Sequence, residues 1–348
     1  MKIKLIFFAV LASLCAIVIS SCGKPQLKIY NWTYYTPDTV IKKFEKEFKV
    51  KVVYDQYSSP EEMYDNLKAG NTGYDVVFPS GDFIPLLLRE NLLGKIDKSL
   101  IPNLKNIDPN ILKKAVYDPE MEYSVPYYYG AAGIIVNTAK VRDYEMSWSI
   151  FSRKDLRNRM VMLDDMREVI GGALKYLGYS VSTTNSSQVT AARNLINNSW
   201  KPNLVKFDAD NFGKGYANGD FWVVHGYAEV IFEEIANNPQ LIKDTVFFIP
   251  KEGGQAYIDN MCIVIDAKNV ELAHKFINFI HRPEIYAEFT DSFGFPATVN
   301  VPARQYKTGE SLYTVEQLEN TELPEDLGQA LMYYSYAWYN SIKVGKYR

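Results

Sequence analysis

The chain has 348 residues, of which 47% are hydrophobic and 14% aromatic, and its formal net charge is −3. This length is large for one hydrophobic core, so two lobes are expected. The weakly acidic balance argues against nucleic acid as a partner, because a nucleic-acid-binding protein is expected to carry a basic face.

The N-terminus has the features of a secretory signal. Two lysines precede an apolar run over residues 5–19, which is short for a permanent membrane span. The next residues, 19–23 (ISSCG), are similar to a bacterial lipobox, which implies cleavage before Cys22 and lipidation of that cysteine. The alternative is an ordinary signal peptide cut near Ser21, with Cys22 left free.

The rest of the chain is expected to lie outside the membrane, tethered by the lipid, because no later segment approaches the apolar length of a span. Removal of Lys2 and Lys4 with the signal lowers the formal charge from −3 to −5. Cys262 is then the only thiol besides Cys22, and its apolar neighbours favour a core position. No disulfide is expected.

The first third of the chain alternates between strand and helix patterns. Residues 27–32, 50–54 and 74–78 have the pattern of strands, and residues 40–48 and about 61–69 have helical periodicity. This alternation predicts a mainly parallel sheet, whose ligands bind beyond the carboxyl ends of the strands.

Two polar and aromatic stretches lie at such strand ends. Residues 32–35 (WTYY) follow the first strand, and residues 80–82 (SGD) follow the third. They are the first candidates for a binding site.

Two segments are interpreted as crossings between the lobes. Residues 123–137 run from a tyrosine-rich stretch into an apolar one, and residues 256–259 begin the return. A helix over 267–281 is assigned to the first lobe. A strand over 221–224 and a C-terminal helix over about 323–342 are assigned to the second.

The middle of the chain joins an apolar strand pattern to the start of a helix, at residues 161–169 (VMLDDMREV). Asp165 and Glu168 fall three apart, on one face of the first helical turn. One interpretation is an N-cap aspartate followed by a glutamate at the third helical position, both favoured by the helix dipole. The other is that the two carboxylates line a cleft and hold a cation.

Motifs for catalysis are absent from the sequence. It contains no GxSxG, P-loop, paired CxxC or HExxH pattern. His274 and His281 are expected to be solvated on a charged helix, and His225 has no second histidine or cysteine nearby. Binding is therefore favoured over catalysis, and neither a metal nor a cofactor is expected.

Six segments carry a resemblance to a known family: residues 30–35 (YNWTYY), 74–80 (YDVVFPS), 125–127 (VPY), 164–169 (DDMREV), 250–254 (PKEGG) and 294–296 (GFP). In the same order, they resemble the bacterial periplasmic spermidine/putrescine-binding proteins of polyamine ABC importers, the PotD type. The resemblance implies an α/β periplasmic-binding-protein fold, with two lobes, mixed central sheets and a hinge of crossing segments.

The expected domain limits follow from these crossings. They are a signal peptide at 1–21, a lipidated linker at 22–26, lobe 1 at 27–132 and 258–302, and lobe 2 at 133–257 and 303–348.

Carried over by position, the resemblance implies a ligand site at the lobe 1 rim and the crossing strand. Trp32 and Tyr35 correspond to aromatic walls, and Thr33 and Ser80 to their polar neighbours. Asp259 matches the family's acid on the crossing strand.

In the second lobe, Asp165 and Glu168 match the family's acids. Tyr227 and Tyr257 replace tryptophans, and Phe295 stands where spermidine binders have a tyrosine. Core packing is the alternative for Tyr227 and Phe295.

Two departures affect the charge pattern of the site. Asp82 occupies a position that is tyrosine in the spermidine protein, and Tyr34 replaces an acid. A plain turn residue is the alternative for Asp82.

The chemistry of a polyamine agrees with these residues. Near neutral pH it is a chain of ammonium groups separated by methylenes, so its host needs carboxylates at intervals and flat apolar walls between them. The expected protein is a monomeric lipoprotein that captures spermidine or putrescine and delivers it to an inner-membrane permease, without catalysis. The alternatives are another cation or an amino acid as cargo, and a periplasmic enzyme on the same scaffold.

Overall fold

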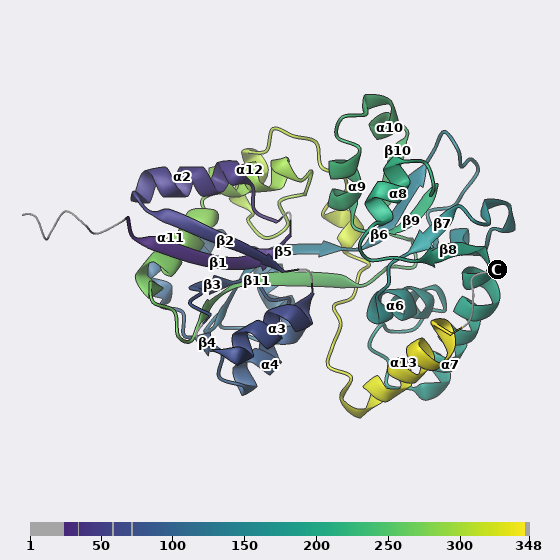
Figure 1. The fold of residues 1–348 in the computed structure, drawn as a ribbon, viewed down its shortest axis with the longest axis horizontal. Helices are drawn as coiled ribbons and strands as arrows, with labels where there is room; N and C mark the ends of the chain where they lie inside the picture. Colours follow the sequence, from purple (N-terminus) through teal and green to yellow (C-terminus); the bar gives the residue numbers. More distant parts are fainter. Residues whose placement is uncertain (1–23, 34, 58, 71, 345–348) are drawn as a thin grey trace, which may run out of the picture.

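The computed structural model describes residues 24–33, 35–57, 59–70 and 72–344. They form two α/β lobes that lie side by side, each built on its own sheet (Figure 1). The predicted signal peptide, Cys22 and Tyr34 lie outside the described residues. In the described part of the chain, no helix is long and apolar enough to span a bilayer.

The sheet of lobe 1 is mixed. In spatial order its strands are β2 (Lys51–Tyr57), β1 (Gln26–Trp32), β3 (Val76–Val77), β11 (Ala256–Val264) and β4 (Leu93–Gly94), and β5 (Ser124–Ala131) also pairs with β11. β1 runs parallel to β2 and β3, whereas β11 is antiparallel to β3, β4 and β5. The carboxyl end of β1, at Trp32, therefore points toward lobe 2 (Figure 1).

Helices cover both faces of this sheet. One face carries α2 (Asp38–Phe48), α11 (Val270–Ile280) and α12 (Pro283–Ser292), and the other carries α3 (Pro60–Ala69) and α4 (Ile84–Arg89), while α5 (Pro109–Lys114) packs beside β5. Alternate residues of one strand serve the two faces. Ile29 packs in the core with α2, and Tyr30 packs in the core with α3.

The sheet of lobe 2 is also mixed. Its strands in order are β10 (Thr245–Phe248), β6 (Gly133–Asn137), β9 (Val223–Gly226), β7 (Met160–Met162) and β8 (Leu204–Phe207). One face carries α8 (Phe212–Ala217), α9 (Ala228–Glu234) and α10 (Pro239–Lys243), and the other carries α6 (Met166–Tyr176), α7 (Ser186–Leu195) and α13 (Leu331–Ala337). The expected architecture of two α/β lobes with mixed sheets is confirmed.

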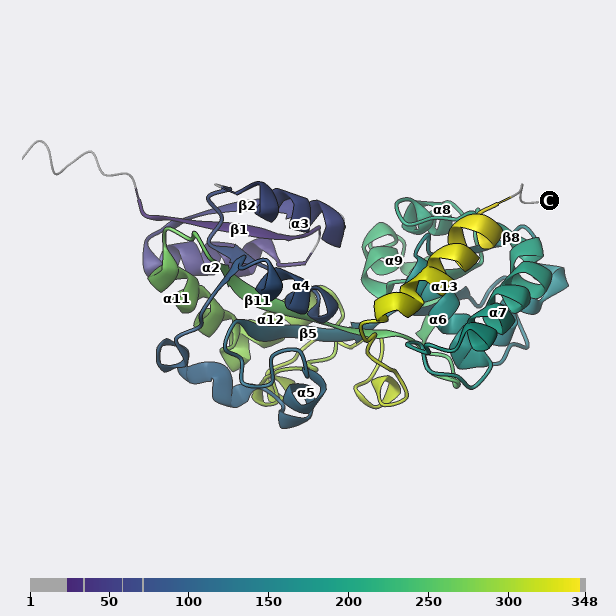
Figure 2. The ribbon, with the colours of Figure 1, turned by 90° about the horizontal axis from the view of Figure 1, so that it is seen from below.

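The lobes are joined by crossing segments (Figure 2). β5 continues into β6, and β11 runs back antiparallel to β5, as the sequence predicts. A third crossing is implied by the predicted lobe limits, but its pairing was not predicted: Glu322 forms a parallel bridge with Gln255, and its carbonyl oxygen accepts the N–H of Ala256 at 2.9 Å. The strands of each sheet fall within the predicted lobe limits except for Gln26 at the start of β1 and the first two residues of β11, Ala256 and Tyr257, which pair in the sheet of lobe 1. The limits themselves stay a prediction.

The C-terminal helix is shorter than predicted. Periodicity suggests a helix over about 323–342, but α13 begins at Leu331 and is followed by a π turn over Trp338–Ile342. Pro324 disfavours a helical backbone at the residue before it. The bridge of Glu322 to the hinge also holds the start of this segment extended.

His274 and His281 are buried rather than solvated, which corrects the prediction for both. They are 2% and 0% exposed. The Nε2 of His274 accepts the backbone N–H of Asp97 at 2.8 Å, and the ring of His281 packs on Tyr286 with centroids 5.9 Å apart. α11 packs against the core of lobe 1, so these positions face inward.

Gly253 provides a test of the third crossing. Its φ is +90°, and a Cβ there would lie 2.1 Å from the carbonyl oxygen of Asn320. We expect Gly253→Ala to lower the free energy of unfolding by about 2–5 kcal/mol, from left-handed strain plus overpacking. Gly178→Ala is the control, because Gly178 has φ +80° and no atom within 4 Å. Equal losses in chemical denaturation would contradict the close approach.

Candidate functional site

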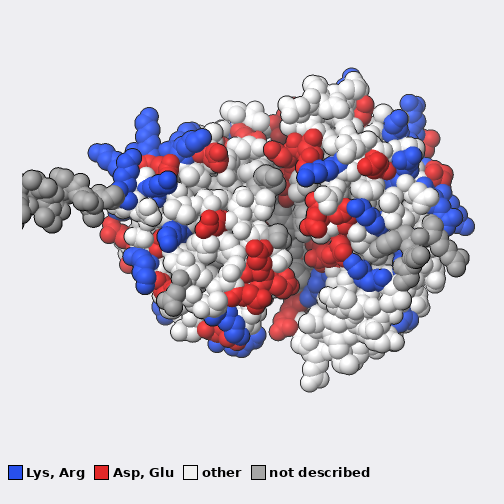
Figure 3. Space-filling view, in the orientation of Figure 1, with Lys and Arg blue, Asp and Glu red and all other residues white. Residues whose placement is uncertain are grey.

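A groove separates the two lobes, and acidic side chains lie along both of its sides (Figure 3). The carboxyl end of β1 and the crossing strand β11 reach this groove from lobe 1 (Figure 1). The start of α6 and the start of α9 reach it from lobe 2. The predicted site residues belong to these four elements and to the turn after β3, except for Phe295, which follows α12.

Trp32 forms a half-buried wall at the end of β1. Its indole N–H donates to the carbonyl oxygen of Phe78 at 2.9 Å, and its ring lies 4.6 Å from that of Tyr57, centroid to centroid. These contacts hold the indole in place while part of it stays open. Thr33 is exposed beside it, and its hydroxyl donates to the Tyr57 carbonyl at 3.4 Å.

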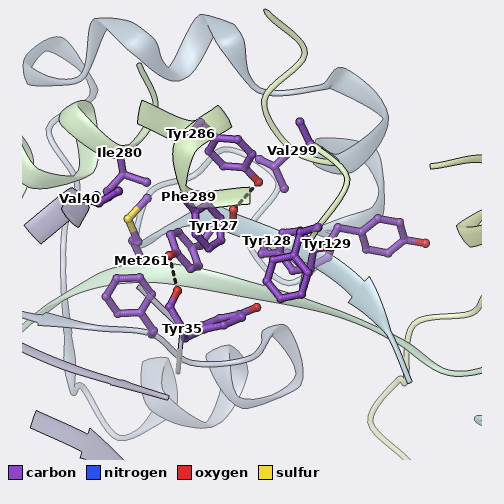
Figure 4. Close-up of a cluster of buried hydrophobic side chains, with 14 of the residues drawn as sticks. Tyr35, Val40, Tyr127, Tyr128, Tyr129, Met261, Ile280, Tyr286, Phe289 and Val299 are labelled. Carbon is purple, nitrogen blue, oxygen red and sulfur yellow. Dashed lines mark hydrogen bonds between the residues drawn. The ribbon is translucent and has the colours of Figure 1, made fainter. Parts of the chain in front are cut away.

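Tyr35 connects this wall to the crossing strand. Its hydroxyl donates to Asp259 Oδ2 at 2.6 Å. Its backbone carbonyl accepts the hydroxyl of Tyr127 at 2.7 Å, and the Tyr127 carbonyl accepts the hydroxyl of Tyr286 at 2.8 Å. Figure 4 shows this buried chain of tyrosines behind the site. Tyr35 is thus positioned by the core of lobe 1.

Asp259 is a buried carboxyl at the centre of the groove, 5% exposed. Its backbone forms an antiparallel bridge with Ser80, which places the turn after β3 beside the crossing strand. Burial raises the pKa of Asp259 to about 7, with further raising by the carboxylates of Asp82 and Glu229 and a lowering by the Tyr35 hydrogen bond. Asp82, which is exposed, is therefore close enough to act on Asp259.

Asp165 caps α6, because its Oδ1 accepts the backbone N–H of Glu168 at 2.9 Å. The N-cap interpretation is therefore correct for Asp165. Its side chain is open to solvent, yet protein surrounds it on several sides, as expected in a cleft. This enclosure, together with the Glu168 carboxylate, raises the pKa of Asp165 to about 6.

Glu168 points away from the cap and into a buried polar group. Its Oε1 accepts the Gln255 amide at 3.0 Å, and its Oε2 lies 3.6 Å from His225 Nε2. Glu168 is 5% exposed, and His225 is fully buried. The Glu168 carboxylate is thus held by β9 and by the residue that precedes β11.

Tyr227 lies among the acids, half-buried at the end of β9. Burial raises its pKa well above the usual value, and the carboxylates of Glu168, Asp165, Glu229 and Asp259 raise it further. All four act on one phenol, so they share one region of the groove.

Tyr257 forms the wall next to Tyr227, with ring centroids 6.0 Å apart at an interplanar angle of 75°. Phe295 is different, because it is fully buried and stacks on Tyr128 with centroids 4.2 Å apart. Phe295 therefore lies behind the groove surface, whereas Tyr227 and Tyr257 reach it.

Glu229 was missed by the sequence analysis. It lies in the first turn of α9, two residues after Tyr227, and burial raises its pKa to about 7. The rule that ligands bind beyond strand carboxyl ends applies to β9 as it does to β1. That rule would have identified Glu229 had it been applied to lobe 2.

The acids of this groove lack lysine and arginine partners, and the one basic neighbour is His225 beside Glu168. No lysine or arginine among the described residues forms an ion pair with Asp82, Asp165, Glu168, Glu229 or Asp259. Within the same residues, no group of three or more His, Cys, Asp and Glu could hold a metal ion. The arrangement suits an organic cation whose charges are spread along its length.

Comparisons with known proteins agree with this geometry. The family model described as bacterial extracellular solute-binding protein matches residues 39–311. The chain is 36% identical to the spermidine/putrescine-binding periplasmic protein of Escherichia coli, over 92% of each chain. It is 35% identical to the putrescine-binding periplasmic protein SpuD of Pseudomonas aeruginosa, over 84% of this chain and 83% of SpuD.

Solved structures extend the likeness to the fold. The crystal structure of the TpPotD lipoprotein of Treponema pallidum superimposes with a TM-score of 0.87 and 49% identity. It covers 91% of this chain and 99% of the TpPotD chain. The two-lobe arrangement described above is therefore that of a periplasmic binding protein.

The raised pKa of Asp259 means that the folded protein is more stable when this carboxyl is protonated, whereas binding of a cation needs it ionised. A carboxyl whose folded pKa exceeds its ordinary value of 3.8 binds more protons in the folded state. Its contribution to stability is therefore present below about pH 4 and lost as the pH rises to about 7.

We expect Asp259→Asn to melt at a higher temperature than the wild type at pH 8, with a smaller difference at pH 4. The asparagine can still accept the Tyr35 hydroxyl. Thermal denaturation of the empty protein at both pH values checks this. A lower melting temperature of the variant at pH 8 would contradict it.

Proposed function

The chain belongs to the bacterial extracellular solute-binding proteins, and we propose that its cargo is a polyamine, spermidine or putrescine, held between the two lobes. The observation that carries the proposal is the group of unpaired carboxyls between aromatic side chains. Charged groups with raised pKa values and no basic partner are poorly stabilised in an empty groove. A multiply charged ammonium ligand would supply the missing positive charges.

The contacts divide by chemistry. Carboxylates would bind the ammonium groups, and aromatic faces would pack on the methylenes and on the charges. The proposed ligand contacts are Trp32, Thr33, Tyr35, Ser80, Asp82, Asp165, Glu168, Tyr227, Tyr257 and Asp259. Phe295 would support the wall from behind through Tyr128.

The energies are sufficient for a physiological receptor. Each cation–π contact contributes about 0.5–2 kcal/mol, with the larger values where water is excluded. Micromolar affinity requires about 8 kcal/mol net. Closure of the lobes about the crossing segments would exclude water, whereas the same acids on an open surface would contribute about 0–1 kcal/mol each.

The location and partners form the second half of the proposal. The family is extracellular, and its curated relatives named above are periplasmic. We propose that lipid on Cys22 anchors the protein and that it delivers its cargo to an ABC permease without changing it chemically. A lipidated cysteine explains why the apolar leader ends in the lipobox-like residues 19–23.

Calorimetric titration of the protein lacking residues 1–22 tests the cargo. Putrescine and spermidine should each bind with one site per protein. Butane-1,4-diol, which has the carbon chain of putrescine without its charges, is the matched control and should not bind. No binding of either amine, or equal binding of the diol, would sink the proposal.

The affinity should depend on pH in a defined direction. Asp165 and Asp259 have pKa values of about 6 and about 7, so both must lose a proton to hold an ammonium group. Primary amines titrate near pH 10 and stay charged throughout. We expect the affinity for putrescine to rise from pH 6 to pH 8. An affinity that is flat or falls over this range would contradict the role of these acids.

A further inference from the structure

Glu229 is an acid of the groove that the family resemblance did not indicate. It lies in the first turn of α9, and Figure 1 shows this helix on the side of lobe 2 that faces lobe 1. Glu233, one helical turn later, is exposed, whereas Glu229 is half-buried. The two residues lie on the same face of the helix, so it is the first turn of α9 that is partly covered and the second that is open.

The start of α9 packs on the crossing strand, because the ring of Tyr227, the residue before the helix, lies 6.0 Å from that of Tyr257 on β11, centroid to centroid. The Glu229 carboxylate acts on groups of the same strand. It raises the pKa of Tyr257 and of Asp259, both on β11, and that of Tyr313. It also raises the pKa of Tyr227, which immediately precedes α9. Its neighbours are thus the aromatic wall and the central acid of the site.

An ordinary structural role accounts for only part of this position. Glu229 lies in the first turn of α9, where the helix dipole favours an acid and the backbone N–H of Glu229 itself lowers the pKa. Burial outweighs this hydrogen bond, because the pKa is still raised to about 7. No lysine or arginine among the described residues forms an ion pair with the Glu229 carboxylate.

We propose that Glu229 is a further carboxylate contact for one ammonium group of the cargo, acting together with Asp259. The proposal rests on the proposed function. It divides the acids of the groove into two sets, with Asp165 and Glu168 on α6 and with Asp259 and Glu229 at the crossing strand. Tyr227 precedes α9 and packs on Tyr257 of β11, and carboxylates of both sets raise its pKa.

Two sets of carboxylates match the two terminal ammonium groups of a diamine. Each end would be held by a pair of acids, and the Tyr227 ring would pack on the methylenes between them. Removing Glu229 would halve the negative charge at one end and leave the other end intact.

The experiment compares Glu229→Gln with Glu233→Gln at pH 8. The substitution is nearly isosteric in both, and the two positions lie on the same helix. We expect Glu229→Gln to weaken putrescine binding about tenfold or more, as for loss of one partner of a desolvated charge pair. Glu233→Gln should bind within about twofold of the wild type.

The melting temperature of the empty protein separates a ligand contact from a structural acid. A ligand contact predicts that Glu229→Gln melts at the wild-type temperature or above, because an uncompensated charge is removed. Wild-type affinity in Glu229→Gln, or a clearly lower melting temperature, would overturn the inference. Absence of polyamine binding in the wild type would instead overturn the proposed function, so the two failures are distinguishable.

Discussion

The hydrogen bond from Tyr35 to Asp259 joins the two features on which the site depends. Tyr35 is fixed by the tyrosine chain in the core of lobe 1, and Asp259 lies on a strand that connects the lobes. The hydroxyl is the only side-chain donor to Asp259 among the described residues. Burial and two neighbouring carboxylates raise the pKa of Asp259, and this hydrogen bond lowers it. The net pKa is about 7. The site is therefore built around a carboxyl whose charge and hydrogen-bonding capacity are only partly matched by its neighbours.

The lack of a lysine or arginine partner distinguishes the acids of the groove from several acids elsewhere on the surface. Glu47, for example, is paired with Arg282, and Asp291 is paired with Lys307. In the groove the carboxyls face phenols, amides and each other. A structure that stabilised these acids internally would leave little free energy to be gained from a cation. The fold thus leaves several charges uncompensated where the proposed cargo would bind.

The strand and helix order, the two main crossings and the strand-end position of Trp32 could be predicted from the sequence, because alternation and periodicity are local properties. Asp165 was indicated by its spacing to Glu168 at the start of a helix, whereas Asp259 came from the family resemblance, and the environments of both required the tertiary structure. Phe295 illustrates the limit: an exposed and a buried aromatic ring look alike in sequence, and packing against Tyr128 decides between them.

Other features escaped prediction for physical reasons. Glu322 pairs with Gln255 across a long separation in sequence, and no local pattern records such a contact. Glu229 is one of several acids in a short helix and shares a helical face with Glu233, and only the tertiary packing at the start of α9 separates the two. His281 is followed by Arg282, Pro283 and Glu284, yet the core of lobe 1 encloses it.

The amide of Gln255 has a mechanical consequence. It holds the carboxylate of Glu168, while its own backbone is tied to the third crossing at Glu322. In the proposed receptor, a rotation of one lobe relative to the other would shift the Gln255 amide and with it the Glu168 carboxylate. A single side chain would then connect the position of an acid in the groove to the geometry of the hinge.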